Sequence, residues 1–330
     1  MAALATDLAL VPARRLVTSP VDAIFRLGPG DRPLVAAGDS VVVGAPIAER
    51  LRDPRLDEHV IPPTLEPLPG EPWTGAGRRG EAHVPVGEYV FEWLGRWRIA
   101  TSDVADPLET PFAGIVREVR PGSGITIRAA GRGMRGIVAL GGATRGRLQA
   151  GTDSELRAGG LDVGSAGTIL VVGSRVDAET LTRARAMGIR GIVVAGLSSK
   201  ERRDFLASEA RQRSALHRLP PFAVLILDGA LRRPLAGAVQ ALLGALAGHE
   251  VAIVTNPPML VFDRPDLAIP EPPPDLVRIR SGSLAGREGR FVEAIGPRRF
   301  AGRVHLEAGI VRLPDGTTAA VPIGDLERFT

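Results

Sequence analysis

The sequence predicts a multi-domain protein in which a central α/β domain lies between two smaller domains built mainly from β-strands. Three observations carry this prediction. Short strand-like segments separated by glycine and proline turns fill residues 1–150. Strands then alternate with helices over residues 151–263, a pattern typical of an α/β layer. A proline-rich linker, 264–275, precedes a last stretch of strands, 276–330.

Composition narrows the possible functions. The chain has 330 residues, of which 44% are hydrophobic, enough to build the cores of two or three domains. Cysteine is absent, which excludes disulfides, thiolate nucleophiles and cysteine-bound zinc. The five histidines are dispersed along the chain, so we predict no metal site and no bound cofactor.

Charge and hydropathy give two further expectations. The formal net charge is only +4, so a nucleic-acid surface would have to come from local clustering of arginines. The first residues lack the pattern of a signal peptide, and the longest apolar stretch, 234–249, is too short to cross a membrane. We therefore expect a cytoplasmic protein with no membrane insertion.

The N-terminal domain contains an internal repeat. Ser19–Phe25 returns in altered form as Thr110–Val116, and Gly-Asp and proline turns lie nearby. Over residues 16–50 and 108–150 the pattern resembles the two halves of a barrel-sandwich hybrid, the biotinyl/lipoyl-like fold. Carriers of that family attach their cofactor to a lysine. Residues 1–150 contain no lysine, so we expect no covalent lipoyl or biotin group.

The repeat is interrupted by an insertion, 52–107, which is predicted to form a loop followed by a hairpin. It contains every tryptophan of the chain, at Trp73, Trp93 and Trp97. Two interpretations stand. The aromatic side chains pack a small hairpin, or they form a contact patch that stacks on bases or anchors a partner.

Two motifs suggest catalysis or cofactor binding but lack the required context. Gly131–Gly136 matches the GxGxxG pattern, yet it leads into the strand-like Ile137–Gly142 rather than a helix. We therefore expect a glycine-rich hairpin with arginines on it. Asn256–Met259 is similar to the NPP motif of amino-methyltransferases, but Met259 stands where that motif has an aromatic residue. This favours a simple proline turn, and we predict no catalytic residues.

The central domain is expected to contain a mostly parallel sheet. Ligands of such sheets bind beyond the carboxyl ends of the strands. The candidates there are Gly173–Arg175 and Gly196–Ser199, which could hold an anion or simply cap helices. The predicted elements are strands at 168–172, 189–195, 222–227 and 251–254, and helices at 177–187, 198–216 and 234–247.

The C-terminal domain begins with the stretch Val277–Val292, which contains a strand and a turn with glycines at Gly282, Gly286 and Gly289, and a second short strand is expected at Arg290–Ala294. This stretch resembles the KOW motif of NusG-type transcription factors and several ribosomal proteins. The later segment 321–327 resembles the strand that closes such domains. The resemblance implies a small SH3-like β-barrel that binds RNA, a ribonucleoprotein or a protein partner.

Arginines gather in this domain. Residues 276–330 contain nine arginines and six acids, and arginine can contact phosphate with two hydrogen bonds. The alternative is a solubilising surface in which glutamates are interleaved. The predicted nucleic-acid-binding residues are Arg278, Arg280, Arg287, Arg290, Arg298, Arg299 and Arg303.

These observations predict a non-enzymatic protein that docks on RNA or a ribonucleoprotein machine through its last domain, while the other domains contact proteins. A structural scaffold that binds only proteins is the alternative. A small-ligand binder or enzyme that uses the α/β domain is the third possibility.

Overall fold

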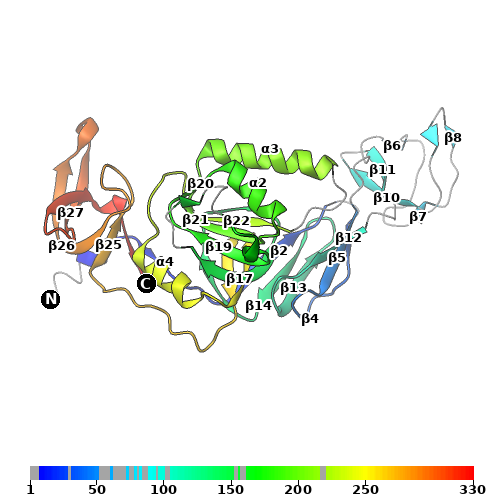
Figure 1. The fold of residues 1–330 in the computed structure, drawn as a ribbon, viewed down its shortest axis with the longest axis horizontal. Coiled ribbons are helices and arrows are strands. Elements are labelled where there is room, and N and C mark those ends of the chain that lie inside the picture. The colour runs from blue at the N-terminus through cyan, green and yellow to red at the C-terminus, as the bar shows by residue number, and fades with distance from the viewer. Residues whose placement is uncertain are drawn as a thin grey trace.

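The computed structural model describes residues 7–28, 31–51, 105–151, 155–156, 161–215 and 221–330, together with six short strands of the insertion between 60 and 100. The protein is mostly β, with several sheets and a few helices (Figure 1). The helices are α2 (Ala178–Ala186), α3 (Ser199–Ala215) and α4 (Gly237–Ala245). No helix in the described part of the chain is long and apolar enough to cross a membrane.

An eight-stranded mixed sheet forms the centre of the molecule. Its four inner strands β17, β19, β21 and β22 run parallel, and the strands on both sides of them are antiparallel. The order across the sheet is β15 (Arg132–Arg135), β24 (Pro258–Phe262), β23 (Glu250–Thr255), β17 (Thr144–Ala150), β19 (Thr168–Val172), β21 (Gly191–Gly196), β22 (Ala223–Gly229) and β16 (Val138–Gly141).

The sheet is less parallel than the sequence suggests, because the chain changes direction after α4. The first three predicted strands pair in parallel as β19, β21 and β22. The fourth, β23, returns on the far side of β17 and runs antiparallel to it. It continues into β24 through the turn at Asn256 and Pro257, as expected for a proline turn.

One segment joins the two ends of this sheet. β15 and β16 are separated only by Gly136 and Ile137, yet they pair with β24 and β22 at opposite ends. The Gly136 N–H donates to Pro258 at 3.0 Å and the Ile137 N–H to Ile226 at 2.8 Å. The predicted glycine-rich hairpin is therefore wrong: β15 and β16 are two strands joined by a short bend, and they do not pair with each other.

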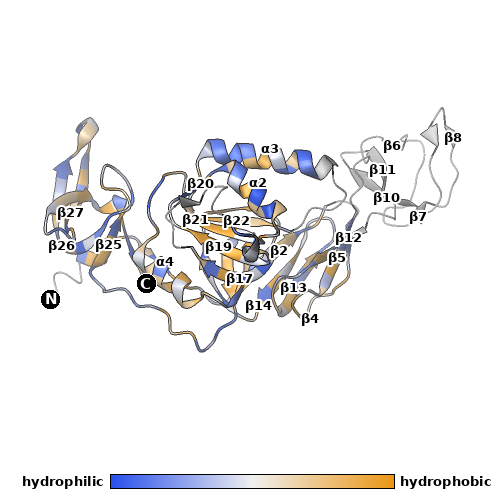
Figure 2. Ribbon diagram, viewed as in Figure 1, coloured by the Kyte–Doolittle hydropathy of each residue, from blue (hydrophilic) through white to orange (hydrophobic). Residues whose placement is uncertain are grey.

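The two faces of the central sheet are covered by different elements. Ile169 and Val171 of β19 belong to the core beneath α4, whereas Leu170 and Val172 belong to the core beneath α2 and α3. This alternation follows from the two-residue period of a strand. Three of the inner strands, β19, β21 and β22, are buried on both faces over most of their length, and β19 and β21 appear hydrophobic in Figure 2, whereas β17 alternates between buried and exposed residues. Helices on both faces are the arrangement that such strands require.

Two small sheets precede and flank the central sheet. They share a core that includes Phe25 and Ile47 and that is completed by Val254 and Val261 of the central sheet. One sheet has the order β2 (Val21–Arg26), β14 (Gly124–Ala129), β13 (Gly114–Arg120) and β4 (Ser40–Val41). The other has the order β12 (Ala105–Glu109), β5 (Pro46–Leu51) and β3 (Arg32–Pro33).

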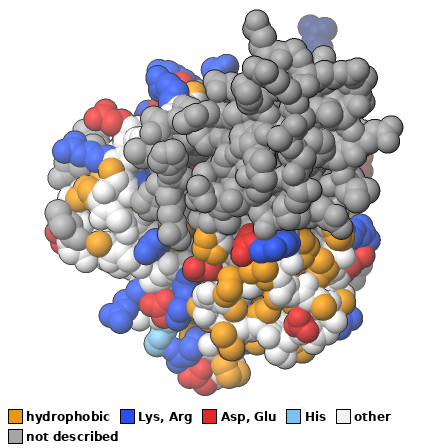
Figure 3. All heavy atoms as spheres, turned by 90° about the vertical axis from the view of Figure 1, so that its right-hand side faces the viewer, with side chains coloured by type: hydrophobic (Ala, Val, Ile, Leu, Met, Phe, Trp, Pro, Cys, Tyr) orange, Lys and Arg blue, Asp and Glu red, His pale blue; other side chains and the backbone are white. Residues whose placement is uncertain are grey.

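The domain boundary expected at residue 150 does not follow the sheets. β15, β16 and β17 precede residue 150 but belong to the central sheet. The resemblance of residues 16–50 and 108–150 to a barrel-sandwich hybrid stays a prediction. Figure 3 views the molecule from the side of these small sheets, where hydrophobic side chains lie among charged ones at the surface. Val42 and Ile115, in the region of these sheets, are 69% and 48% exposed.

The insertion contains a four-stranded sheet in the order β6 (Val60–Ile61), β11 (Arg96–Ala100), β10 (Glu88–Trp93) and β7 (Pro72–Trp73). Its strands bring the backbones of Trp73, Trp93 and Trp97 into one sheet. Their side chains, predicted as a possible contact patch, lie outside the part that the structure describes. Two further pairs are β8 (Arg78–Arg79) with β9 (Ala82–His83), and β18 (Glu155–Leu156) with β20 (Arg175–Val176).

The C-terminal sheet includes the beginning of the chain. β1 (Ala13–Arg14) pairs in parallel with β29, and Leu8 and Val11 enter the same core as Phe291. The linker contributes as well, because Leu267 and Ile269 pack against the central core. The order across the sheet is β1, β29 (Leu326–Phe329), β25 (Leu276–Ile279), β26 (Glu288–Arg299), β27 (His305–Arg312) and β28 (Thr318–Pro322).

Candidate nucleic-acid interface

The glycine turn between β25 and β26 has the geometry that its glycines require. Gly282 and Gly286 have positive φ angles of 77° and 89°. Gly289 is needed for another reason, because a Cβ there would lie 2.5 Å from the carbonyl oxygen of Arg312. Glycine is thus used both for left-handed backbone and for close approach of strands. The assignment of this turn to the KOW family stays a prediction.

One side of this turn is covered by the central domain. A Cβ on Gly286 would lie 2.9 Å from Cβ of Arg233 and 3.0 Å from Cδ of Pro234. Nearby, the Gly237 N–H at the start of α4 donates to Glu288 Oε1 at 2.8 Å. The segment between β22 and α4 therefore packs directly on the turn. That side of the turn cannot contact RNA in this arrangement.

Arg278 does not lie on a nucleic-acid surface. Its side chain is 1% exposed, and Nη2 donates to Asp228 Oδ2 at 2.9 Å and to the Pro234 carbonyl at 2.6 Å. Nη1 donates to Glu327 Oε1 at 3.2 Å. Burial alone would lower the pKa of Arg278, but the hydrogen bond to Asp228 and the two carboxylate charges raise it overall.

The expectation for Arg278 is wrong because both faces of β25 are buried. Alternation along Val277, Arg278 and Ile279 predicts one wet face, which would hold for a free small barrel. Here Val277 and Ile279 face the core of the C-terminal sheet, while Arg278 faces the central domain. Arg278 is a structural link between the two.

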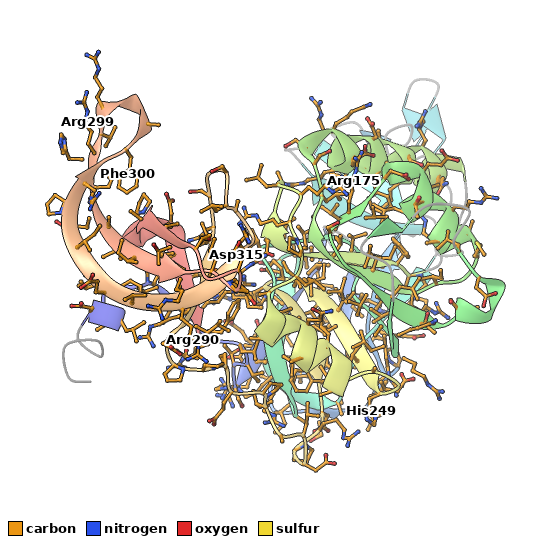
Figure 4. All side chains as sticks on the ribbon, turned by 60° about the vertical axis from the view of Figure 1, so that its left-hand side comes forward. Arg175, His249, Arg290, Arg299, Phe300 and Asp315 are labelled. Atoms are coloured by element: carbon orange, nitrogen blue, oxygen red, sulfur yellow. The ribbon has the colours of Figure 1, made fainter. Side chains whose placement is uncertain are left out.

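Three of the predicted arginines are exposed, but each forms an ion pair with a carboxylate. Arg287 lies 2.9 Å from Asp315, and Arg290 lies 2.9 Å from Asp275. Arg280 is half exposed and 3.9 Å from Glu327. Exposed pairs of this kind are weak, so they could open, but a phosphate would have to compete with the carboxylate. Figure 4 shows Arg290 and Asp315 on the body of the C-terminal sheet.

The other three arginines form a distinct group at the end of the β26–β27 hairpin. Arg298 and Arg299 end β26, and Arg303 lies in the short 3-10 turn Ala301–Arg303 that connects the strands. All three are exposed, and none has an ion-pair or hydrogen-bond partner for its side chain among the described residues. In Figure 4 the hairpin extends away from the rest of the protein, with Arg299 at its end.

The hairpin also presents apolar side chains. Val304 and Leu306 are 49% and 41% exposed, and Phe300 is half-buried. Leu306 stands opposite Arg298, so basic and apolar groups share one ribbon. Two β-bulges interrupt β26 along this pairing, and bulges increase the local twist and bend of a strand. We refer to residues 298–306 as the hairpin tip.

The backbone at the hairpin tip is strained. Arg303 has a φ of 63° and is the only non-glycine residue with positive φ in the described part of the chain. A left-handed conformation costs a non-glycine residue on the order of 1–2 kcal/mol. Such outliers cluster at functional sites, so the conformation of Arg303 supports a role for the tip without defining it.

One of the two candidate anion segments at the carboxyl ends of the parallel strands caps a helix. The Asp177 carboxylate accepts from the Thr180 N–H at 2.7 Å and caps α2. The Ser198 hydroxyl accepts from the Glu201 N–H at 3.2 Å at the start of α3. The Ser198 contact matches the capping alternative stated for Gly196–Ser199, whereas Gly173–Arg175 leads into β20 and supplies no cap for α2.

Comparisons with protein-family models, with curated proteins and with solved structures found no match to this chain. The described residues contain no group of three His, Asp or Glu side chains placed to hold a metal ion. The structure thus divides the seven predicted arginines into one buried, three paired and three unpaired. Sequence spacing could not separate them, since Asp228, Asp275 and Asp315 lie far from their partners along the chain.

Proposed function

We propose that the protein is a non-enzymatic binding protein that docks on RNA, free or within a ribonucleoprotein, through the hairpin tip. The observation that carries this proposal is the presence of three exposed arginines, Arg298, Arg299 and Arg303, without carboxylate partners among the described residues. Each can form charge-assisted hydrogen bonds with a phosphate without first breaking an ion pair. The KOW-like resemblance supports the same module as the binding element.

The geometry of the hairpin tip favours an extended polyanion. The tip projects from the body of the protein, so it can reach a groove or a single-stranded segment without a clash from the central domain (Figure 4). Phe300 lies between the two basic groups along the chain, where an aromatic ring can stack on a base. Arginine itself stacks on bases as well as pairing with phosphate.

The test compares two double variants that remove the same charge from the same module. Arg298→Ala with Arg299→Ala removes two unpaired arginines, whereas Arg287→Ala with Arg290→Ala removes two paired ones. Fluorescence anisotropy of the full chain would use single-stranded RNA, structured RNA and duplex DNA at two salt concentrations. The proposal expects the first variant to lose at least tenfold in RNA affinity and the second to change less than threefold.

The salt dependence gives an independent measure. For single-stranded nucleic acid each phosphate contact contributes about 0.7 to the slope of log K against log salt, so losing two contacts should reduce the slope by about 1.4. Equal losses in the two double variants would show general electrostatic attraction and overturn the site. An unchanged slope in the hairpin variant would overturn it as well.

The exposed Val304 and Leu306 favour a second candidate, a protein-binding scaffold. Apolar side chains beside arginines are typical of protein interfaces. The double change Val304→Ser with Leu306→Ser separates the two candidates. An RNA-binding tip should retain RNA affinity within about threefold, because its phosphate contacts remain, whereas a protein-binding tip should lose its partner in a pull-down at high salt.

A further inference from the structure

A large cleft lies between the N-terminal sheets and the central sheet, far along the chain from the hairpin tip. Its volume is about 1040 Å³, at the upper end of the range for small-ligand sites. Ile24 and Arg26 of β2 line one part, and the glycine-rich segment Gly141–Gly146 lines another. One wall of the cleft therefore comes from an N-terminal sheet and another from the central sheet.

The cleft lies at the amino ends of the parallel strands. Gly167 precedes β19, Arg190 precedes β21 and Phe222 precedes β22, and all three line it. The anion sites predicted from the sequence lie instead at the carboxyl ends of these strands, where Ser198 caps α3.

The charge of the cleft is unbalanced towards arginine. Five arginines and three glutamates line it. Arg145 pairs with Glu250 at 3.0 Å, whereas Arg26, Arg190 and Arg202 have no side-chain partner among the residues that the structure describes. These three come from β2, from the connection before β21 and from α3.

Arg190 is the most informative of the three because it is half-buried. A guanidinium that is partly removed from water needs hydrogen-bond acceptors or an opposite charge nearby. Thr144, which also lines the cleft, has a buried hydroxyl with no hydrogen-bond partner in the described structure. The Thr144 oxygen is itself buried, so Arg190 is the group of these two that can reach a ligand in the cleft.

We propose that this cleft binds a small ligand that carries a multiply charged oxyanion, with Arg190 as its main contact and Arg26 and Arg202 as further cationic groups. The oxyanion is a phosphate group or a set of carboxylates, which share the chemistry that arginine recognises. The site does not depend on RNA binding by the hairpin tip, because no arginine of the tip lines the cleft.

Isothermal titration of the full chain with inorganic pyrophosphate and with citrate tests the proposal, against sodium chloride at matched ionic strength. Arg190→Ala should weaken binding at least tenfold. Arg183→Ala is the matched control, since Arg183 is an exposed arginine of α2 that does not line the cleft. It should change the affinity less than twofold.

Binding of pyrophosphate alone would assign the phosphate class, and binding of citrate alone the carboxylate class. Binding of neither anion would overturn the proposal, as would equal losses in the Arg190 and Arg183 variants. If Arg190→Ala fails to fold, the double change of the two exposed residues, Arg26→Ala with Arg202→Ala, decides by the same tenfold criterion. The Arg298→Ala and Arg299→Ala variant should bind these anions normally, which keeps this test separate from that of RNA binding.

Discussion

Arg278 and Asp228 meet at the junction between the C-terminal and central sheets, with 2.9 Å between Nη2 and Oδ2 and both side chains buried. Asp228 also accepts from Arg14 of β1 at 3.2 Å, so one carboxylate at the end of β22 contacts two strands of the C-terminal sheet. Arg14 lies over the ring of Phe329 as well. The two sheets are therefore linked by buried ion pairs in which Asp228 contacts both Arg14 and Arg278.

Loss of Arg278 should destabilise the protein strongly. Arg278→Met leaves Asp228 and Glu327 buried without their main partner, and breaking such a pair costs about 3–5 kcal/mol. Arg14 still neutralises part of Asp228, so we expect the lower end of that range. Urea unfolding followed by circular dichroism would measure it. Arg290→Ala, which opens an exposed pair, should cost no more than about 1 kcal/mol, and equal costs would contradict the structural role of Arg278.

The two left-handed glycines of the turn should respond differently to alanine. Both substitutions incur the cost of a positive φ, on the order of 1–2 kcal/mol. Only Gly286→Ala also pushes a methyl group against Arg233 and Pro234, because Gly282 faces open space. Gly286→Ala should therefore be the more destabilising in thermal unfolding. A larger effect of Gly282→Ala would show that the turn is not packed against the central domain.

Substitution of Arg303 should separate stability from binding. Arg303→Gly relieves the positive φ and should raise the free energy of unfolding by on the order of 1 kcal/mol. It also removes an unpaired cation, so RNA affinity should fall as it does for Arg303→Ala. Arg303→Lys keeps the charge and the strain. Urea unfolding and anisotropy on the same samples would test both expectations, and an Arg303→Gly protein that binds RNA normally would remove Arg303 from the site.

Asp315 offers a prediction about pH. Hydrogen bonds from the Thr317 hydroxyl and N–H, with a smaller contribution from Arg287, lower the pKa of Asp315 to about 2 from 3.8. A lowered pKa means that the ionised carboxylate stabilises the fold above pH 3.8, and that this stabilisation is lost as the pH falls through about 2. Thr317→Ala should raise the pKa of Asp315 towards 3.8.

Carboxyl NMR titration would measure that change directly. Arg287→Ala is the control, and it should raise the pKa of Asp315 less than Thr317→Ala does. The opposite order would mean that the ion pair, rather than the turn, holds the carboxylate ionised. It would also mean that Arg287 is more tightly engaged than its exposure suggests.

Local features of the fold could be predicted from the sequence, because they depend on neighbouring residues. The apolar run at β19 and the Asp177 cap of α2 lie where the pattern places them. The parallel pairing of β19, β21 and β22 also follows from strand and helix alternation. These signals need no knowledge of distant segments.

Long-range features could not be predicted. β1 pairs with β29, which is more than 300 residues away in the sequence. Gly136 and Ile137 connect β15 and β16, which lie at opposite ends of the strand order of the central sheet. No local pattern encodes either pairing. The same limit applies to the candidate site. Arg290 forms an ion pair with Asp275, and only the folded structure shows that this carboxylate lies beside it.

The pairing of Ala13 and Arg14 with Arg328 and Phe329 has a consequence for the making of the protein. Translation proceeds from the N-terminus, so β1 leaves the ribosome long before its partner β29. The C-terminal sheet cannot reach its full width until β29 has also left the ribosome. A ribosome that stalls before β29 would leave Ala13 and Arg14 without the strand that they pair with.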